Sequence, residues 1–258
     1  MSQLDAAADA ADIVSIAAIQ LTAVVGLDLW GRTDTPQPFF LSLAFHLAPS
    51  SLLLAAATDN AQFSIRPWDV IRTVEAVVAR HAPFVSGKAF FRTVIDSLEG
   101  TGACEQCRLR ADMRRALGCL RAEEGVRWEA IWHASALRRI AWSAHHVLVP
   151  VTLGQTEHER SMKQHVALDV RFEEADGVSE DVPYALLLEN VIQLVEASAF
   201  RSLERLVHEA TRVAVLGSPH VRQATVSVKR LKAAVGADYT AVQMTRTRDA
   251  FTEVPSIL

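Results

Sequence analysis

The sequence contains few cysteines and no long apolar run. The three cysteines are Cys104, Cys107 and Cys119, an odd number that does not pair into a disulfide framework. No stretch reaches the roughly 18 apolar residues of a membrane-spanning helix. The first residues carry acids where a targeting peptide would carry bases. These absences predict a cytoplasmic protein that does not enter the membrane.

A strong charge of either sign is also missing. The formal net charge is −4, which gives no electrostatic reason to expect nucleic acid or an anionic membrane as a partner. The basic run at residues 108–121 has no interleaved aromatic residues and is typical of a solvated face. We therefore expect neither nucleic acid nor membrane among the partners.

Residues that could bind a metal rarely occur at a usable spacing. Cys104 and Cys107 form a single CxxC motif without a second pair or a histidine at finger spacing, and zinc needs four ligands, or three and a water. A metal or redox role stays open beside the favoured interpretation, a pair of reduced thiols. His145 and His146 are neighbours on a strand and point to opposite faces, so they do not chelate one ion. No metal site is expected.

Residues 184–216 have the clearest pattern in the chain. Apolar residues recur there at helical spacing in two runs, which predicts two amphipathic helices joined at Ala197–Ser198. Ser202 can cap the second helix, whose first turn then holds Glu204. Because an acid at that position stabilises a helix by itself, Glu204 is either purely structural or part of a site.

The predicted elements occur twice in the same order. In the first half they are strands at residues 13–25, 36–47 and 126–132, helices at 68–81 and 88–98, and loops at 50–60 and 100–112. In the second half the helix pair recurs at 184–216 and the closing strand at 239–246. Gly26 and Gly154 follow strand-like runs at corresponding points. A period near half the chain length indicates a tandem duplication.

Each predicted repeat is an α+β layer, with antiparallel strands on one side and two helices on the other. We expect a flexible arm at residues 1–12, a first repeat at 13–134, a second at 138–250 and a tail at 251–258. An isolated repeat of this kind leaves strand edges exposed, which favours assembly into a multimeric barrel.

Short motifs in both halves carry a family resemblance. GLDLWGRTDTPQPFFLSL (26–43) opens the first repeat and LGQTEHERSMKQHVALDV (153–170) the second. A tyrosine–helix–glutamate–helix segment and the stretch VSVKRLKAAVGADYTAVQMTR (226–246) follow in the second repeat. Over residues 12–249, this order of motifs resembles the dihydroneopterin aldolase family of the tunnelling fold (T-fold), in its fungal tandem form.

The resemblance implies a lyase of folate biosynthesis. Such an enzyme cleaves 7,8-dihydroneopterin by a retro-aldol reaction to 6-hydroxymethyl-7,8-dihydropterin and glycolaldehyde, without metal, Schiff base or cofactor. By resemblance, Glu204 binds the amino and ring N–H groups of the pterin, since a carboxylate offers two acceptors to two parallel donors. Leu203 lies beside it in the substrate-binding set. The resemblance places Glu159, Tyr184 and Arg230 at the catalytic positions.

Arg230 stands where the family has a lysine. Arginine stays protonated at any working pH and cannot act as a base, but it can stabilise a developing negative charge. Lys229 and Lys232 flank it and could bind substrate or take the lysine's role if the loop shifts. Structural alternatives stay open for the catalytic positions: Glu159 as a solvated turn acid, Tyr184 as a packed helix start, and Arg230 as a charge on an edge strand.

The first repeat lacks matching site residues. By alignment, Gly31 stands at the first glutamate, Ile65 at the tyrosine, Lys88 at the anchoring glutamate and Met113 near the lysine. A lysine would repel the N–H edge of a pterin, so we expect the first repeat to be non-catalytic. In the family's rings the tyrosine reaches the neighbouring unit, which predicts that Tyr184 lies outside the pocket formed by its own repeat.

Two other functions stay open. A relative repurposed for a non-pterin substrate of fungal secondary metabolism would explain the missing proton-transfer residues. A non-catalytic binding or scaffold protein would keep only the barrel. By resemblance, the expected partners are a small-molecule substrate and further copies of the chain in a homotetramer.

Overall fold

The computed structural model describes residues 12–26, 32, 34–98, 104–113, 121–133, 136–234 and 236–251. The predicted arm and tail lie outside the described residues, apart from Asp12 and Phe251, and so do Gly31 and Cys119. The described residues fall into two compact units.

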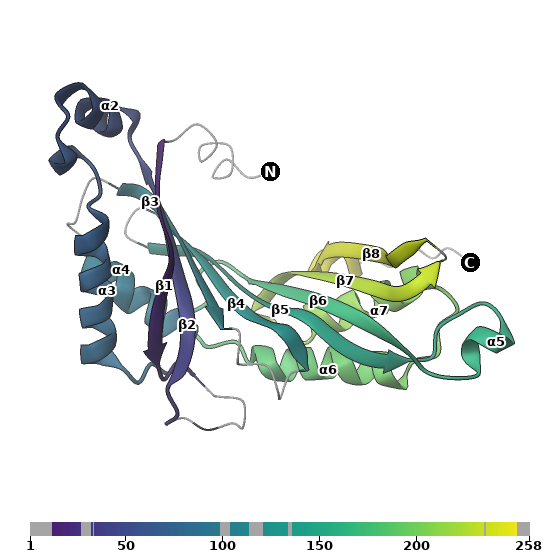
Figure 1. The fold of residues 1–258 in the computed structure, drawn as a ribbon. Helices are drawn as coiled ribbons and strands as arrows, with labels where there is room; N and C mark the ends of the chain where they lie inside the picture. The colour runs from purple at the N-terminus through teal and green to yellow at the C-terminus, as the bar shows by residue number, and fades with distance from the viewer. Residues whose placement is uncertain are drawn as a thin grey trace. The chain divides into compact units, whose positions relative to one another are not determined.

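The first unit contains the described residues up to Met113 together with Trp128–Ile140. Its N-terminal strands pair antiparallel in chain order: β1 (Asp12–Ala23), β2 (Gln37–Leu47) and β3 (Cys104–Met113) (Figure 1). Its helices are α2 (Pro49–Thr58), the 3₁₀ helix η1 (Ala61–Phe63), α3 (Pro67–His81) and α4 (Gly87–Leu98). Phe90 of α4 is fully buried and meets the ring of Phe39 edge-on at 5.2 Å. This contact packs α4 against β2 in the core of the unit.

The second unit contains described residues 121–127 and those from Ala141 onward. Strands β4 (Ala122–His133) and β5 (Ala136–Val151) contribute residues to both units. After β5, strands β6 (Gln164–Glu174), β7 (Val221–Ala234) and β8 (Ala237–Thr247) pair antiparallel in chain order. The helices are α5 (Glu157–Arg160), α6 (Tyr184–Ala197), α7 (Leu203–Leu216) and the 3₁₀ helix η2 (Arg248–Phe251).

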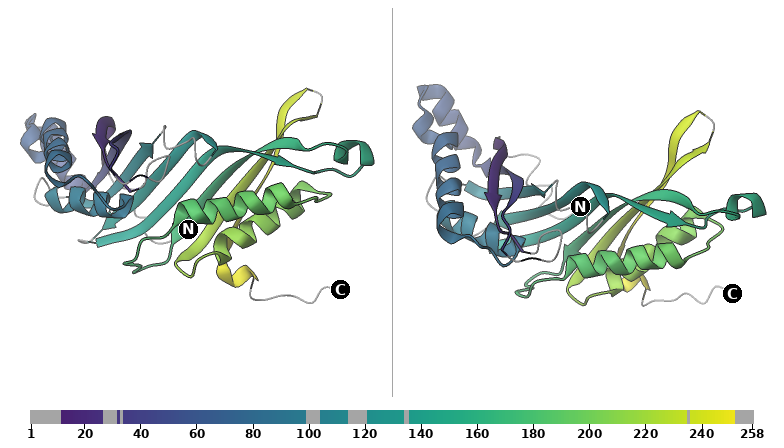
Figure 2. Two further views of the ribbon diagram at one scale, coloured as in Figure 1. Left: turned by 90° about the horizontal axis from the view of Figure 1, so that it is seen from below. Right: turned by 60° about the horizontal axis from the view of Figure 1, so that its bottom comes forward.

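Helices α6 and α7 lie side by side on one face of the second unit's strands (Figure 2). Val166, Leu168 and Val170 share one face of β6 and are fully buried, and Ala167 on the opposite face is buried as well. The predicted pair of helices is confirmed, with the break at Ser198, the C-cap of α6. No helix among the described residues is long and apolar enough to cross a membrane.

The two units share a bulge that marks them as repeats. In β1, Ala18 adopts a left-handed conformation at φ 56° and its N–H donates to the Ser42 hydroxyl at 3.0 Å. In β5, His146 adopts φ 54° and its N–H donates to Asp169 Oδ1 at 2.9 Å. Left-handed backbone is uncommon for residues other than glycine, and here the side chain of the neighbouring strand stabilises it both times. The predicted tandem α+β organisation is confirmed.

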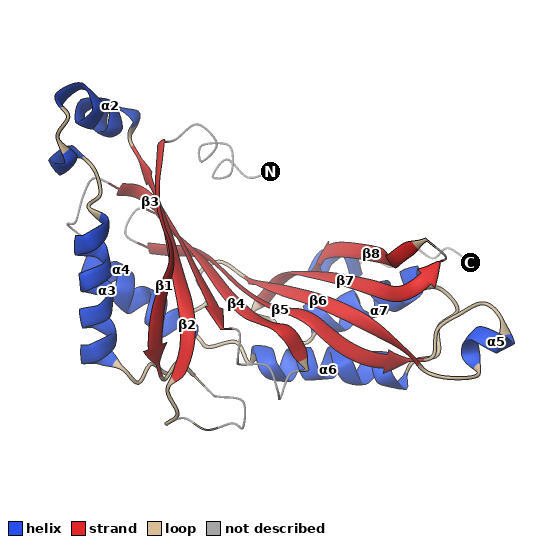
Figure 3. Ribbon diagram, viewed as in Figure 1, coloured by secondary structure: helices blue, strands red, loops and turns tan. Residues whose placement is uncertain are grey.

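Two segments predicted as loops have regular structure. Residues 49–58 form α2 (Figure 3), which begins with Pro49 and ends at Asp59 in the left-handed conformation. None of its residues is buried, so its sequence carries no apolar periodicity. Residues 104–113 form β3, in which Leu109 and Ala111 are buried on one face while arginines occupy the other. Those arginines made a strand resemble a solvated loop.

Candidate functional site

The segment between β5 and β6 is built around Glu159. The Thr156 hydroxyl accepts a hydrogen bond from Glu159 N–H at 3.2 Å. In return, Glu159 Oε2 accepts from the N–H groups of Thr156 at 3.1 Å and Gln155 at 2.9 Å. This reciprocal capping box starts α5 and fixes the rotamer of the glutamate. It leaves Oε1 for another partner.

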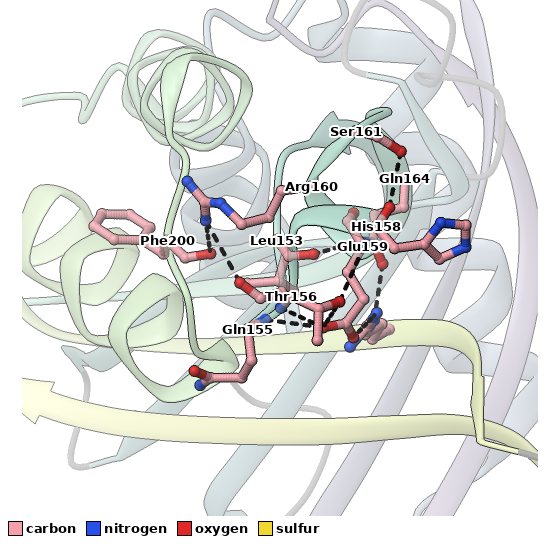
Figure 4. A network of polar contacts seen from close by, with 11 residues as sticks. Leu153, Gln155, Thr156, His158, Glu159, Arg160, Ser161, Gln164 and Phe200 are labelled. Carbon is pink, nitrogen blue, oxygen red and sulfur yellow. Dashed lines mark hydrogen bonds and ion pairs between the residues drawn. The ribbon is translucent and has the colours of Figure 1, made fainter.

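Arg230 of β7 is that partner. Its Nη2 donates to Glu159 Oε1 at 2.9 Å and its Nε donates to Gln164 Oε1 at 2.8 Å. Gln164 in turn donates through Nε2 to the carbonyl of Glu159 at 3.1 Å and to the carbonyl of Leu153. Figure 4 shows this polar network. One glutamine at the start of β6 thus ties α5 to β7.

The hydrogen bonds keep Glu159 ionised. The Thr156 N–H, the Arg230 guanidinium and the Gln155 N–H lower the pKa of Glu159 from 4.5 to about 2. The side chains of Glu159 and Arg230 are 32% and 23% exposed, so solvent or a ligand can reach the pair. Because the carboxylate and the guanidinium both stay charged near neutral pH, this pair is suited to holding charge and poorly suited to carrying a proton.

The lowered pKa predicts a pH dependence of stability. Since the folded-state pKa of Glu159 lies below its unfolded value, its contribution is fully present above about pH 4.5 and is lost as the pH falls towards 2. We expect the difference in urea midpoint between the wild type and Glu159→Gln to shrink over that window. Urea titrations at several pH values measure it. A difference that stays constant from pH 6 to pH 2.5 would contradict the assignment.

The turn before α7 contacts the segment that contains α5. The N–H of Gly154 donates to the carbonyl of Phe200 at 3.3 Å, which joins the α5 segment to that turn. Ser202 caps α7 as predicted, accepting from Arg205 N–H at 3.2 Å. Glu204 follows in the first turn and is exposed, and its carboxylate makes no hydrogen bond or ion pair within the described part of the chain. Leu203 beside it is partly exposed.

Tyr184 does not belong to the network around Glu159 and Arg230. Its hydroxyl donates to Glu174 Oε1 at 2.6 Å, and its ring stacks on Trp142 with centroids 5.5 Å apart. The residue is 3% exposed, and burial together with the Glu174 carboxylate raises the pKa of its hydroxyl far above the ordinary value. Glu174 ends β6 and Gln164 begins it, which places them roughly 33 Å apart along the strand. Within one chain, Tyr184 is therefore remote from the Glu159–Arg230 pair.

Replacing Tyr184 by phenylalanine tests its structural role. The ring stays on Trp142, but the buried Glu174 loses a donor, which we expect to cost about 1–3 kcal/mol of unfolding free energy. Tyr239→Phe, at a 51% exposed tyrosine, is the control and should change stability by less than about 0.5 kcal/mol. Urea unfolding measures both. A Tyr184→Phe protein of unchanged stability would contradict the structural role.

Lys229 points away from Arg230. Adjacent side chains of β7 alternate between faces, and Lys229 Nζ pairs with Asp169 Oδ2 at 2.8 Å. The hydrogen bond with Asp169 raises the pKa of Lys229. To replace Arg230 at the pair with Glu159, this lysine would need a shift in strand register. Lys232 also lies in β7, but its side chain falls outside the described part of the structure.

The first repeat has a different residue at the position that corresponds to Glu204. Ser86 caps the start of α4 by accepting from Ala89 N–H at 3.2 Å, as Ser202 does for α7. Counting from these caps aligns Lys88 with Glu204, and Lys88 is buried at 3% exposure. The first unit therefore holds a lysine where the second presents an open carboxylate.

The remaining correspondences follow from helix starts and strand register. The N-caps Arg66 and Pro183 align Pro67 with Tyr184, which corrects the alignment of the tyrosine with Ile65. Ile65 is a buried core residue that precedes the helix. The bulge acceptors Ser42 and Asp169 pair with Arg110 and Ser227, and three residues further along these strands lie Met113 and Arg230. Met113 therefore corresponds to Arg230, and it is buried.

Sequence reasoning did not single out Gln164, Thr156 or Gly154 as individual site residues. The capping box has a readable signal, the pattern Thr-x-x-Glu at the start of a helix. Gln164 gives no such signal, because its role depends on a hydrogen bond to Arg230, which lies on the neighbouring strand and far away in the sequence. Gly154 is required by close approach: a Cβ atom there would lie 2.4 Å from the Cβ of Glu159.

Metal ligands do not cluster in the described residues. No group of three or more histidine, cysteine, aspartate or glutamate side chains there could hold a metal ion. Cys107 is buried in the first unit. The side chain of Cys104 is outside the description, so the CxxC interpretation stays a prediction.

Comparison with known proteins agrees with this architecture. Residues 144–245 match the model of the FolB dihydroneopterin aldolase family. The uricase of Arthrobacter globiformis shares 11% identity over 96% of this chain and 97% of its own, with a TM-score of 0.69. For the uricase of Bacillus fastidious the values are 10%, 93%, 95% and 0.70. Dihydroneopterin aldolase of E. coli, solved with neopterin, shares 21% identity over 41% of this chain and 97% of its own, at a TM-score of 0.37.

A comparison with curated proteins finds no match. The uricase likeness, at 10–11% identity, concerns the fold, and it extends over both repeats. The family model covers the network of Glu159, Gln164 and Arg230 and the exposed Glu204. The chain is a tandem tunnelling-fold protein whose second repeat carries the sequence pattern of the dihydroneopterin aldolase family.

Proposed function

We propose that the second repeat binds a pterin or a similar planar heteroaromatic ring and acts on it as a dihydroneopterin aldolase-like lyase. The observation that carries the proposal is the network of Glu159, Arg230 and Gln164. It lies within the segment that matches the family model and is open to solvent.

Glu204 is the proposed anchor for the ring. Its carboxylate is exposed and offers two acceptors to parallel N–H donors of a heteroaromatic edge. Leu203, partly exposed at the start of the same helix, is the proposed apolar contact beside it. Desolvating the carboxylate becomes favourable only when the ring supplies both donors.

The proposed chemistry is a retro-aldol cleavage. The bond between the first and second side-chain carbons of dihydroneopterin breaks, and its electron pair passes into the ring system. The hydroxyl on the second carbon loses its proton as glycolaldehyde leaves, and a proton is then added to the first carbon, which gives the 6-hydroxymethyl product. Arg230 stabilises the negative charge that develops on the ring. Glu159 and Gln164 hold the guanidinium in place. Since neither Glu159 nor Arg230 exchanges a proton easily near neutral pH, a water molecule at the exposed pair is the proposed proton carrier.

Turnover of 7,8-dihydroneopterin tests this function. The purified protein should release glycolaldehyde and 6-hydroxymethyl-7,8-dihydropterin, and Glu204→Gln should lose this activity, because the amide exchanges one acceptor for a donor. Asp69→Asn, which changes an acid in the first turn of α3 in the first repeat, is the matched control and should keep full activity. An active Glu204→Gln protein would rule out the proposed anchor.

Two observations favour a second candidate, a repurposed enzyme acting on another ring. Arg230 replaces the lysine of the family pattern, and the Tyr184 hydroxyl is engaged by Glu174 in the core. Calorimetry with urate, the substrate named by the similar uricases, and with neopterin separates the candidates. Binding of urate without neopterin supports the repurposed enzyme. A chain that binds neither ring and tolerates every site substitution is a scaffold.

We also propose that copies of the chain associate through β8. This strand pairs with β7 on one side and is exposed over most of its length. Exposed strand edges favour pairing with another chain. Analytical ultracentrifugation should show a multimer, with a homotetramer as the expected size, and a monomer at micromolar concentration would contradict the proposal.

A further inference from the structure

Arg160 ends α5 and reaches across to the turn before α7. Its Nη1 donates to the carbonyl of Ala199 at 2.9 Å and of Phe200 at 3.3 Å, and it lies 3.5 Å from the carbonyl of Gly154. Figure 4 shows the side chain directed towards Phe200 and away from Glu159. One guanidinium therefore holds backbone carbonyls of two separate loops.

A backbone contact already joins these two loops. Gly154 N–H donates to the carbonyl of Phe200 at 3.3 Å, and in the first repeat Gly26 N–H donates to the carbonyl of Phe84 at 2.9 Å. The backbone contact is thus common to both repeats. Hydrogen bonds donated by a cation are stronger than those donated by a neutral N–H, so Arg160 strengthens the junction of the second repeat.

The junction lies close to Glu204 in the chain. Phe200 precedes Glu204 by one turn of chain, and the Ser202 cap fixes the start of α7 between them. The backbone of Arg160 directly follows Glu159. We infer that Arg160 is a positioning residue that fixes Glu204 relative to the Glu159–Arg230 pair. The inference rests on the proposed function in that it takes Glu204 as the ligand anchor.

A double-mutant cycle tests the inference. Neopterin binding is measured by calorimetry for the wild type, Arg160→Gln, Glu204→Gln and the double variant. We expect Arg160→Gln to weaken binding about tenfold in the wild-type background and to have no further effect beside Glu204→Gln. Arg160→Lys, which keeps the charge but not the planar fork, should rescue binding in part. Arg212→Gln on the exposed side of α7 is the matched control and should bind as the wild type does.

Amide hydrogen exchange gives a readout that needs no ligand. The N–H groups of Gly154 and Arg205, which donate to Phe200 and to the Ser202 cap, should exchange faster in Arg160→Gln. The amide of Leu168 in the core strand should keep its rate, which separates local loosening from global destabilisation.

Each outcome decides a different point. Unchanged exchange at Gly154 and Arg205 overturns the positioning role, and so do additive effects of Arg160→Gln and Glu204→Gln on neopterin affinity. If the wild type binds no neopterin, the proposed function fails, and the exchange rates alone decide whether Arg160 holds the turn.

Discussion

Replacing Arg230 by methionine should lower turnover of the substrate about 10²–10³-fold, the usual cost of removing one donor from a charge-stabilising site. Methionine was chosen because Met113 of β3 occupies the position in the first repeat that corresponds to Arg230. The substitution removes the donors to Glu159 and to Gln164 together. It also leaves the Glu159 carboxylate without its ion-pair partner.

Two further variants sharpen this experiment. Arg230→Lys keeps the positive charge and introduces a group that can transfer a proton, so it should retain or exceed the activity of the wild type. Arg222→Met removes an exposed arginine from the same strand and should leave activity unchanged. Turnover measured at saturating substrate compares all four proteins. An Arg230→Met protein as active as the wild type would show that the network takes no part in the chemistry.

The second large effect is expected at Gly154. An alanine Cβ would lie 2.4 Å from the Cβ of Glu159, and the residue adopts φ +147°. The α5 turn must therefore shift, which breaks the capping box and the junction with Phe200. We expect a loss of about 3 kcal/mol in unfolding free energy.

Gly177 provides a matched control for this substitution. It also adopts a positive φ, +76°, but an added Cβ would meet nothing within 4 Å. Gly177→Ala should cost only about 1 kcal/mol for the backbone conformation. Urea unfolding of both variants isolates the steric part at Gly154. Equal losses would contradict the close packing of Gly154 against Glu159.

The helices with a buried face could be predicted from the sequence. The apolar spacing of α6 and α7 and the Ser202 cap are local signals, and the structure has both. The duplication was equally readable, because both repeats keep the same order of elements. Helix α2 could not be predicted, since a helix that buries none of its residues shows no apolar periodicity.

The site was only partly predictable, because its geometry depends on contacts between distant segments. The motif places Glu159 and Arg230 in the sequence, but their ion pair exists because β6 and β7 align Val166 with Arg230. That Lys229 pairs with Asp169 also depends on this register. The engagement of Tyr184 by Glu174 depends on how the helix start packs over the end of β6. No local sequence pattern encodes any of these three contacts.

A crystal structure of the protein with neopterin would test the central proposal most directly. We predict the ring in the second repeat, with its N–H edge on the Glu204 carboxylate, Arg230 still paired with Glu159, and the Tyr184 hydroxyl still bonded to Glu174. A ligand bound away from Glu204, or a ligand held by Glu204 and also contacted by the hydroxyl of Tyr184 from the same chain, would contradict the account.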